Sequence, residues 1–411
     1  MIERQRNLRI AVYHQLPEGG AKRALYHQLQ QLGKSHHVHL YTSQDTTGEK
    51  LGLSSLVEET HIFKYQPHTF PSQSLLRFFN PTSFLIELPA LDRYFRHLAK
   101  SIDKENYDAA LICHGLVTTP YLLKYLETPT VYYCQEPFRQ GYEYLKTRRP
   151  KTVAGIVKGQ LSKARIDERI LVRTLRSRDI PLPRLANLVL CNSSFSKNQI
   201  DRVYGVSAVV NYLGVDIERF RPLGLPRCGN DGHQFVLSVG EIHPRKGFDL
   251  IVRALARLPH QKRPRLVIVC FQWDVREKMY LERMADEMSV SLEFVRNITD
   301  AELVELYNRA MATVFVPSRE PFGFVPLESM ACGTPVIGAN EGGITESVLD
   351  GQTGFLVERD SIQIKNAIER LLDDAELVAN MGLRGRQLVE SKWTWERSVA
   401  ELEEHLRSVC H

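Results

Sequence analysis

The chain has 411 residues, of which 43% are hydrophobic and 25% are charged, with a formal net charge of +5. This composition is typical of a soluble globular protein, and the length favours two domains over one core. No apolar run approaches the roughly 20 residues needed to cross a bilayer. Because the charged N-terminus leads directly into an expected strand, we expect no cleaved signal peptide and a cytoplasmic location.

The cysteines and histidines lack the spacing of known metal sites. The seven cysteines are scattered and form no CxxC pair, which favours reduced cytosolic thiols over disulfides or a zinc site. The fourteen histidines include no HExxH motif, so we expect no metal ligands. For His36-His37, at the start of an expected strand, a solvated strand end is favoured over a ligand pair.

The first half of the chain alternates apolar strands with helical patterns. A strand at 8–14 is followed by Gly19-Gly20, a helix with apolar residues at helical spacing, and a strand at 38–41. Further apolar runs lie at 61–65, 108–115, 130–135, 186–191 and 208–210. The alternation predicts a doubly wound α/β domain. The missing GxGxxG motif counts against an NAD or FAD enzyme.

Polar residues stand at the ends of several of these strands. His14, His114 and Gln135-Glu136 each follow an apolar run. Ligands of doubly wound sheets bind beyond the carboxyl ends of the strands. Each residue alone is consistent with an ordinary structural role, but the three together predict a binding site at one edge of the sheet.

A strongly basic segment occupies residues 141–180, after an apolar and aromatic stretch at 74–86. It holds eleven Lys/Arg against four acidic residues, a local charge of +7. Apolar residues recur in it at roughly helical spacing, so it either lies on an anionic membrane or packs on its own domain as a long solvated helix. Aromatic residues are not interleaved with the charges, so we expect no nucleic-acid binding.

The second half begins with a Pro/Gly-rich passage at 213–232, which is typical of a link between domains. We therefore expect an N-terminal domain at 1–212 and a C-terminal domain at 213–394. Six further apolar runs predict a second doubly wound sheet, at 235–240, 266–270, 292–295, 313–316, 335–338 and 355–357.

Two loops of the second domain favour an anion. Arg245 and Lys246 come immediately before a helix, where cations and the helix dipole together favour a diphosphate. The segment 318–328 turns through Gly323 into a short helix, whose first backbone N–H groups favour an anion as well.

Two carboxylates, Glu320 and Glu328, bracket the turn in 318–328. Carboxylates are poor phosphate ligands but accept hydrogen bonds from neutral hydroxyls, such as those of a ribose or a sugar ring. We interpret this segment as the binding site for a nucleotide-sugar.

The chain resembles the retaining glycosyltransferase family 4 over nearly its whole length, most strongly from Asn192 to Phe355. The family's Glu-x7-Glu motif matches Glu320 and Glu328, with Pro-Phe-Gly-Phe at 321–324 in the expected place. Other family-like segments lie at 213–216, 220–222, 246–247, 330–336 and 342–346.

The resemblance implies the GT-B fold, in which two Rossmann-like, doubly wound domains face each other across a cleft. The last helix, at 395–411, is expected to cross back onto the N-terminal domain. The C-terminal domain would bind the donor and the N-terminal domain the acceptor. No cofactor is implied beyond a UDP- or GDP-sugar as the donor substrate.

The resemblance also assigns roles to individual residues. Glu320 would contact the hydroxyls of the donor sugar and Glu328 the ribose. Backbone amides around Gly323, Phe324 and Val325 would hold the phosphate or sugar. The remaining expected site residues are Arg245 and Lys246 at the diphosphate, Gly19 and Gly20 near the reacting centre, His114 at the donor sugar or acceptor, and Arg296 near the base.

Two positions depart from the family pattern. Glu241 stands where the family usually has an Arg that pairs with the Lys on the diphosphate, so either Arg245 takes over or donor binding is weakened. Gln135 replaces a frequent His, and Gln cannot exchange a proton near neutral pH. A retaining front-face mechanism tolerates this, because the leaving diphosphate can accept the proton.

The expected function is that of a retaining glycosyltransferase that moves a hexose to a glycan, lipid-linked or small-molecule acceptor. We expect it to be metal-independent, which fits the absence of an Asp-x-Asp motif. The alternative is a catalytically silent GT-B protein that binds a nucleotide or glycan and regulates a partner. If 141–180 binds lipid, the protein would be peripheral on the inner face of the membrane.

Overall fold

The computed structural model describes residues 6–43, 51–65, 81–113, 119–137, 173 and 177–410, with backbone only for 81–88. His114, nearly all of the basic segment 141–180 and residues 74–80 lie outside the described residues. Among the helices of the described part, none is long and apolar enough to span a membrane.

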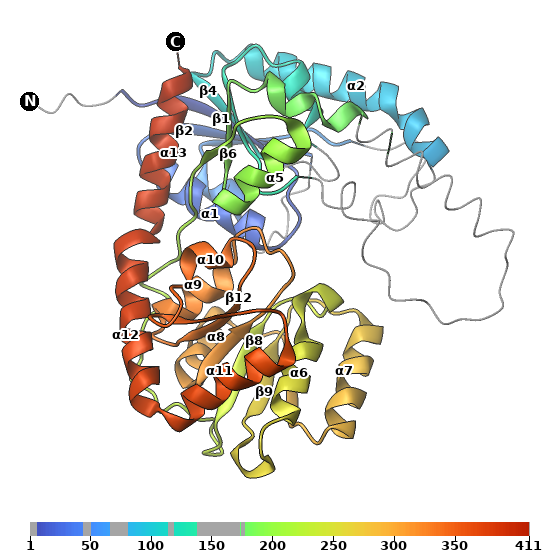
Figure 1. Cartoon of the computed structure of the whole chain (residues 1–411). Coiled ribbons are helices and arrows are strands. Elements are labelled where there is room, and N and C mark those ends of the chain that lie inside the picture. Colours follow the sequence, from blue (N-terminus) through green and yellow to red (C-terminus); the bar gives the residue numbers. More distant parts are fainter. Residues whose placement is uncertain are drawn as a thin grey trace, which may run out of the picture. The chain divides into compact units, whose positions relative to one another are not determined.

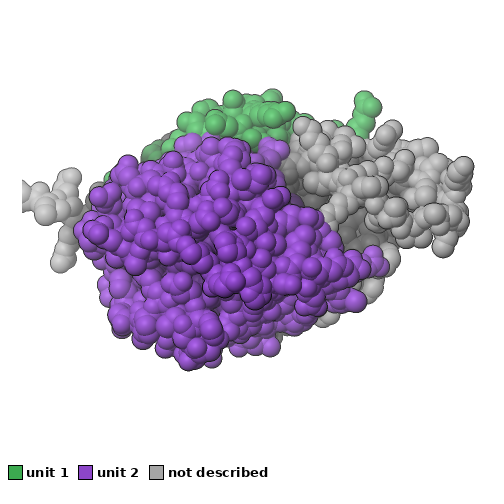
Figure 2. Space-filling model, turned by 60° about the horizontal axis from the view of Figure 1, so that its bottom comes forward, with its two compact units in different colours: residues 1–192, 196–211, 399–411 green, residues 193–195, 212–398 purple. Residues whose placement is uncertain are grey.

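The chain divides into two compact units, coloured separately in Figure 2. Unit 1 comprises residues 1–192, 196–211 and 399–411, and unit 2 comprises 193–195 and 212–398. The end of the last helix therefore belongs to the N-terminal unit, as the predicted crossover requires.

The described part of unit 1 contains a parallel sheet with the order β3-β2-β1-β4-β5-β6-β7 (Figure 1). Its strands are β1 Arg9–His14, β2 His37–Thr42, β3 Glu59–Ile62, β4 Ala109–Cys113, β5 Thr130–Tyr133, β6 Leu188–Cys191 and β7 Val209–Val210. The strand order reverses between β1 and β4. Apolar β-branched and Leu residues fill the central strands, and Val12, Leu111 and Val131 are fully buried.

The helices of unit 1 follow the strands in the chain, as a doubly wound fold requires. Those in the described part of the unit are α1 Gly20–Leu32, α2 Pro81–Asp103 and most of α5 Ser194–Tyr204 and of α13 Trp395–Val409, with short 3-10 turns at Leu53–Leu56, Tyr121–Lys124 and Leu182–Leu185. Helix α13 contacts the rest of this unit through Glu403, whose Oε1 lies 3.4 Å from Nε2 of the buried His36.

Unit 2 holds a second parallel sheet, with the order β10-β9-β8-β11-β12-β13. Its strands are β8 Phe235–Val239, β9 Arg265–Val269, β10 Leu292–Val295, β11 Ala312–Phe315, β12 Val336–Ala339 and β13 Gly354–Val357. Here the strand order reverses between β8 and β11.

Helices connect the parallel strands of unit 2. They are α6 Phe248–Ala256, α7 Val275–Glu287, α8 Asp300–Arg309, α9 Phe324–Ala331, α10 Ile344–Ser347, α11 Ser361–Asp373 and α12 Ala375–Lys392, with 3-10 turns at Pro244–Lys246 and His260–Lys262. Helix α6 packs beside α11 and α7, and α9 packs beside α12 and α8. The prediction of two Rossmann-like, doubly wound domains is confirmed.

Candidate functional site

The ion pair between Lys246 and Glu320 lies at the point where the strand order of unit 2 reverses. Lys246 ends the loop after β8, and Glu320 lies in the loop after β11, its neighbour in the sheet. Their Nζ and Oε2 atoms are 3.0 Å apart, and the side chains are 17% and 21% exposed. Loops diverge at such a switch point and leave a crevice for a ligand. The fold thus brings together two predicted site residues that are far apart in the sequence.

A glycine allows the loop after β8 to lie against β11. Gly247 has a φ of 72°, and a Cβ there would lie 2.7 Å from the carbonyl oxygen of Val316. The backbone N–H of Ser318 donates to the carbonyl of Arg245 at 2.8 Å. These contacts fix the backbone on which Arg245 and Lys246 stand.

A third loop, which follows β12, packs against the backbone of Glu320. The N–H of Gly343 donates to the Glu320 carbonyl at 2.9 Å. A Cβ on Gly343 would lie 2.3 Å from the Pro321 carbonyl oxygen, and one on Gly342 would lie 2.4 Å from the Glu320 carbonyl oxygen. Only glycines permit this approach, so the backbone of the Glu320 loop is held by close packing.

The turn after Glu320 leads into α9. Gly323 precedes this helix with a φ of 92°, a conformation that favours glycine, and Phe324 and Val325 are its first two residues. The N–H groups of a helix's first turn have no partner within the helix and favour an anion. A cation, a carboxylate and a helix N-terminus therefore meet in one unit, which suits a ligand that carries both phosphate and hydroxyl groups.

Comparisons with known proteins match this site and the N-terminal unit separately. Residues 229–388 match the family described as Glycosyl transferases group 1, and residues 18–219 match Glycosyltransferase Family 4. Together the two matches cover most of the chain. The chain belongs to glycosyltransferase family 4.

One curated relative is the GDP-mannose-dependent alpha-(1-6)-phosphatidylinositol monomannoside mannosyltransferase of Mycolicibacterium smegmatis. It is 33% identical over 241 residues, which cover 54% of this chain and 62% of the relative. The match to a human relative, named Alpha-1,3/1,6-mannosyltransferase ALG2, has 30% identity over 53% of this chain and 58% of that protein. The chain thus spans about three fifths of the length of these relatives.

Solved structures of the GT-B fold resemble the chain over nearly its whole length. Sucrose-phosphate synthase from Thermosynechococcus elongatus superposes with a TM-score of 0.73 at 21% identity, over 98% of this chain and 99% of that one. At this level of identity the likeness defines the fold alone.

In this family 4 chain, the other predicted donor-site residues of unit 2 occupy different environments. Glu328 is only 2% exposed, and its Oε2 accepts a hydrogen bond from the hydroxyl of Tyr307 at 2.8 Å. Arg296 is exposed at the carboxyl end of β10, and its guanidinium lies 3.8 Å from the ring centroid of Trp273. Glu241, which departs from the family pattern, is exposed at the carboxyl end of β8, in the loop that carries Lys246.

In unit 1 the predicted residues that the structure describes gather around the start of α1. Gly19 and Gly20 form the turn from β1 into this helix. The Nε2 of Gln135 donates to the carbonyl of Ala21 at 3.5 Å. His14, at the end of β1, is fully buried, and burial lowers its pKa to about 3. Its Nδ1 accepts from the N–H of Leu16 at 3.3 Å. His14 is therefore neutral at physiological pH.

The sequence did not reveal the role of Glu346. Its carboxylate accepts hydrogen bonds from the N–H groups of Ser194 at 2.9 Å and Phe195 at 3.0 Å, at the start of α5. The hydroxyl of Tyr212 donates to the same carboxylate at 2.8 Å. In the sequence, the segment 342–346 is recognisable only as family-like, because the helix start at Ser194 that explains Glu346 lies far away in the chain.

Proposed function

We propose that the protein is a retaining, metal-independent glycosyltransferase that moves a hexose from a UDP- or GDP-sugar to an acceptor hydroxyl. The observation that carries this proposal is the pair of Lys246 and Glu320 at the switch point of unit 2. Lys246 would neutralise the donor diphosphate, and Glu320 would accept hydrogen bonds from the sugar hydroxyls.

In the proposed reaction the bond between the anomeric carbon and the diphosphate oxygen breaks, and its electron pair leaves with the diphosphate. The acceptor oxygen bonds to the anomeric carbon from the same face, and its proton passes to the leaving phosphate oxygen. Lys246, Arg245 and the amides at the start of α9 stabilise the charge that develops on the diphosphate. The positive charge of these groups supports a mechanism without a metal.

We further propose a glycan, a lipid-linked molecule or a small molecule as the acceptor and the cytoplasmic side of a membrane as the place of action. A lipid acceptor is supported by the name of the mycobacterial relative, which acts on a phosphatidylinositol monomannoside. The charge of +7 in residues 141–180 would favour an anionic surface. Co-sedimentation with phosphatidylserine vesicles tests the binding to a membrane surface, and failure of the protein to pellet at low salt would overturn that part of the proposal.

A second candidate function is a silent GT-B protein that binds a nucleotide or glycan and regulates a partner. Glu241 favours it, because an acidic residue in the loop that carries Lys246 would repel a diphosphate. Gln135 favours it as well, because an amide cannot exchange a proton at neutral pH.

The decisive experiment combines donor binding with transfer. Thermal shift against a panel of UDP- and GDP-sugars identifies the donor, and transfer to a panel of acceptors and hydrolysis of that donor are then measured. Glu320→Ala should lower the transfer rate about 100- to 1,000-fold, as expected for the loss of a group that stabilises the transition state. Donor binding without turnover on any acceptor would favour the silent protein.

A matched control breaks a different Lys–acid pair of unit 2. Lys262 and Asp373 are 2.7 Å apart, and both side chains are at least half exposed. Lys262→Ala should transfer at the wild-type rate. Wild-type transfer by Glu320→Ala, in a protein with an unchanged circular dichroism spectrum, would refute the site.

A further inference from the structure

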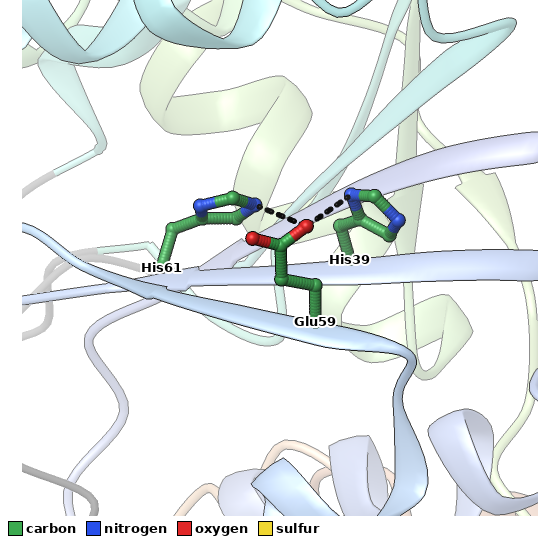
Figure 3. Close-up of side chains that lie close together, drawn as sticks. All are labelled: His39, Glu59 and His61. Carbon is green, nitrogen blue, oxygen red and sulfur yellow. Dashed lines mark ion pairs between the residues drawn. The ribbon is translucent and has the colours of Figure 1, made fainter.

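Three side chains of unit 1 that the proposed function does not use form a compact group at the edge of its sheet. His39 lies on β2, and Glu59 and His61 lie on the edge strand β3. His39 stands opposite Glu59 in the parallel pairing, and residues two apart on a strand share a face. Figure 3 shows the carboxylate of Glu59 between ring nitrogens of the two histidines. We call this group the His–Glu–His cluster.

The spacing of the cluster suits a small divalent cation. Glu59 Oε2 lies 3.6 Å from His61 Nε2 and 3.9 Å from His39 Nδ1. One ligand atom from each residue lies within 4.8 Å of the other two. Tetrahedral zinc, with bonds of about 2.0–2.1 Å, separates its ligand atoms by about 3.4 Å. Small side-chain rotations would therefore close the cluster around one ion.

The chemistry of the donor atoms favours a transition metal over calcium or magnesium. Imidazole is a good ligand for Zn²⁺, whereas Ca²⁺ and Mg²⁺ take oxygen ligands. The Nε2 atom of His61 is buried and has no hydrogen-bond partner among the described residues.

Neighbouring groups would orient the ligands. Glu58 Oε2 lies 3.7 Å from His39 Nε2, on the side of the ring away from the cluster. A small side-chain rotation would bring this carboxylate within hydrogen-bond distance of the ring, where it would fix the tautomer of a histidine ligand. The ring of His61 is stacked on that of Tyr41, with centroids 4.5 Å apart.

One contact competes with an ion at this place. The hydroxyl of Tyr107 lies 2.7 Å from His39 Nδ1 and would release this nitrogen when an ion binds. Its hydrogen bond to the hydroxyl of Tyr41, at 2.8 Å, can remain. The carboxylates of Glu58 and Glu59 offset the loss of this bond by attracting a cation.

We propose that His39, Glu59 and His61 form a zinc site that clamps the edge strand β3 to β2. The three residues supply three ligands, and water fills the fourth position. His39 lies in the middle of β2, and β1 stands between the cluster on β2 and β3 and the far side of the β1–β4 switch point. The ion therefore serves the structure of unit 1 and takes no part in sugar transfer. The proposal is independent of the proposed function.

The test measures Zn²⁺ binding by the whole chain after treatment with a chelator. Cys228 and Cys410, the two described cysteines that are not buried, are first replaced by Ser to remove competing thiols. Calorimetric titration should show one tight site, and Co²⁺ in place of Zn²⁺ should give the intense visible bands of a tetrahedral site. Zn²⁺ should also raise the melting temperature, because it binds only the folded chain.

His61→Ala and the more conservative Glu59→Gln should each lower the affinity at least about 100-fold, since each removes a ligand. The matched control is His37→Ala. His37 is an exposed histidine of β2, the strand that carries His39, and its Nδ1 lies 2.7 Å from Glu58. This variant should bind Zn²⁺ like the parent. The absence of a tight site in the parent, undiminished binding in both ligand variants, or an equal loss in His37→Ala would overturn the proposal.

Discussion

Glu328 of α9 accepts a hydrogen bond from the hydroxyl of Tyr307 in α8, with 2.8 Å between the two oxygens. Glu328 is 2% exposed and Tyr307 is fully buried. The bond therefore joins two helices inside unit 2. A carboxylate has two oxygens, so a hydrogen bond to Tyr307 is compatible with a second one to a ribose hydroxyl. The role of Glu328 at a ribose stays a prediction, and its role in holding α9 can be tested separately.

Tyr307→Phe should destabilise the protein, because it leaves the buried carboxylate of Glu328 without this donor. We expect the free energy of unfolding to fall by about 1–3 kcal/mol, measured by urea denaturation. Tyr280→Phe is the control, since the hydroxyl of Tyr280 accepts an exposed and long bond of 3.4 Å from Arg253. Equal losses of unfolding free energy in the two variants would show that the Tyr307–Glu328 hydrogen bond stabilises the protein no more than an exposed one.

Gly343→Ala should displace the Glu320 loop. The added Cβ would lie 2.3 Å from the carbonyl oxygen of Pro321, so the backbone next to Glu320 must shift. A shift of about 1 Å in a binding group costs about 100-fold in rate. We expect this loss in the transfer assay.

Gly351→Ala separates this displacement from the general strain of replacing a glycine. Gly351 has a φ of 69°, and a Cβ there would meet none of the described atoms within 4 Å. The variant should lose about 1–2 kcal/mol of stability through backbone strain and keep its transfer rate. If Gly343→Ala also transferred at the wild-type rate, the support of Glu320 by the third loop would be refuted.

The sequence predicted the doubly wound domains because their strands are short, apolar and separated by helical patterns. The glutamates at 320 and 328 could be found because the segment between them has a local turn signal in Pro321 and Gly323. Their different environments could not be found in this way. Glu320 pairs with Lys246 from the loop of the neighbouring strand, whereas Glu328 is buried against Tyr307 of α8. Both facts depend on tertiary packing.

The His–Glu–His cluster shows the same limit. Its ligands come from two strands that pair in the sheet, so no local motif joins His39 to Glu59. Glu59 and His61 share a face of the sheet only if the segment around them is a strand, so their proximity follows from the sequence only once β3 is assigned. Metal spacings known from helices and loops do not cover a site whose ligands meet across a strand pair.

His14 should make the stability of the protein depend on pH. Burial lowers its pKa from the ordinary 6.5 to about 3, and the nearby charge of Lys22 acts in the same direction. Above pH 6.5 the ring is neutral in both the folded and the unfolded chain, so it contributes no pH dependence. Between pH 6.5 and 3 only the unfolded chain binds the proton, so stability falls as the pH falls.

At pH 5.0 the contribution of His14 amounts to a loss of about 2 kcal/mol relative to pH 7.5. His14→Gln does not titrate, so the difference in unfolding free energy between these two pH values should shrink by this amount, even if the variant is less stable at both. His97→Gln, which removes an exposed histidine of unit 1, should keep the wild-type difference. An unchanged difference in His14→Gln would mean that the folded chain protonates His14 as readily as the unfolded chain does, and would refute the lowered pKa of His14.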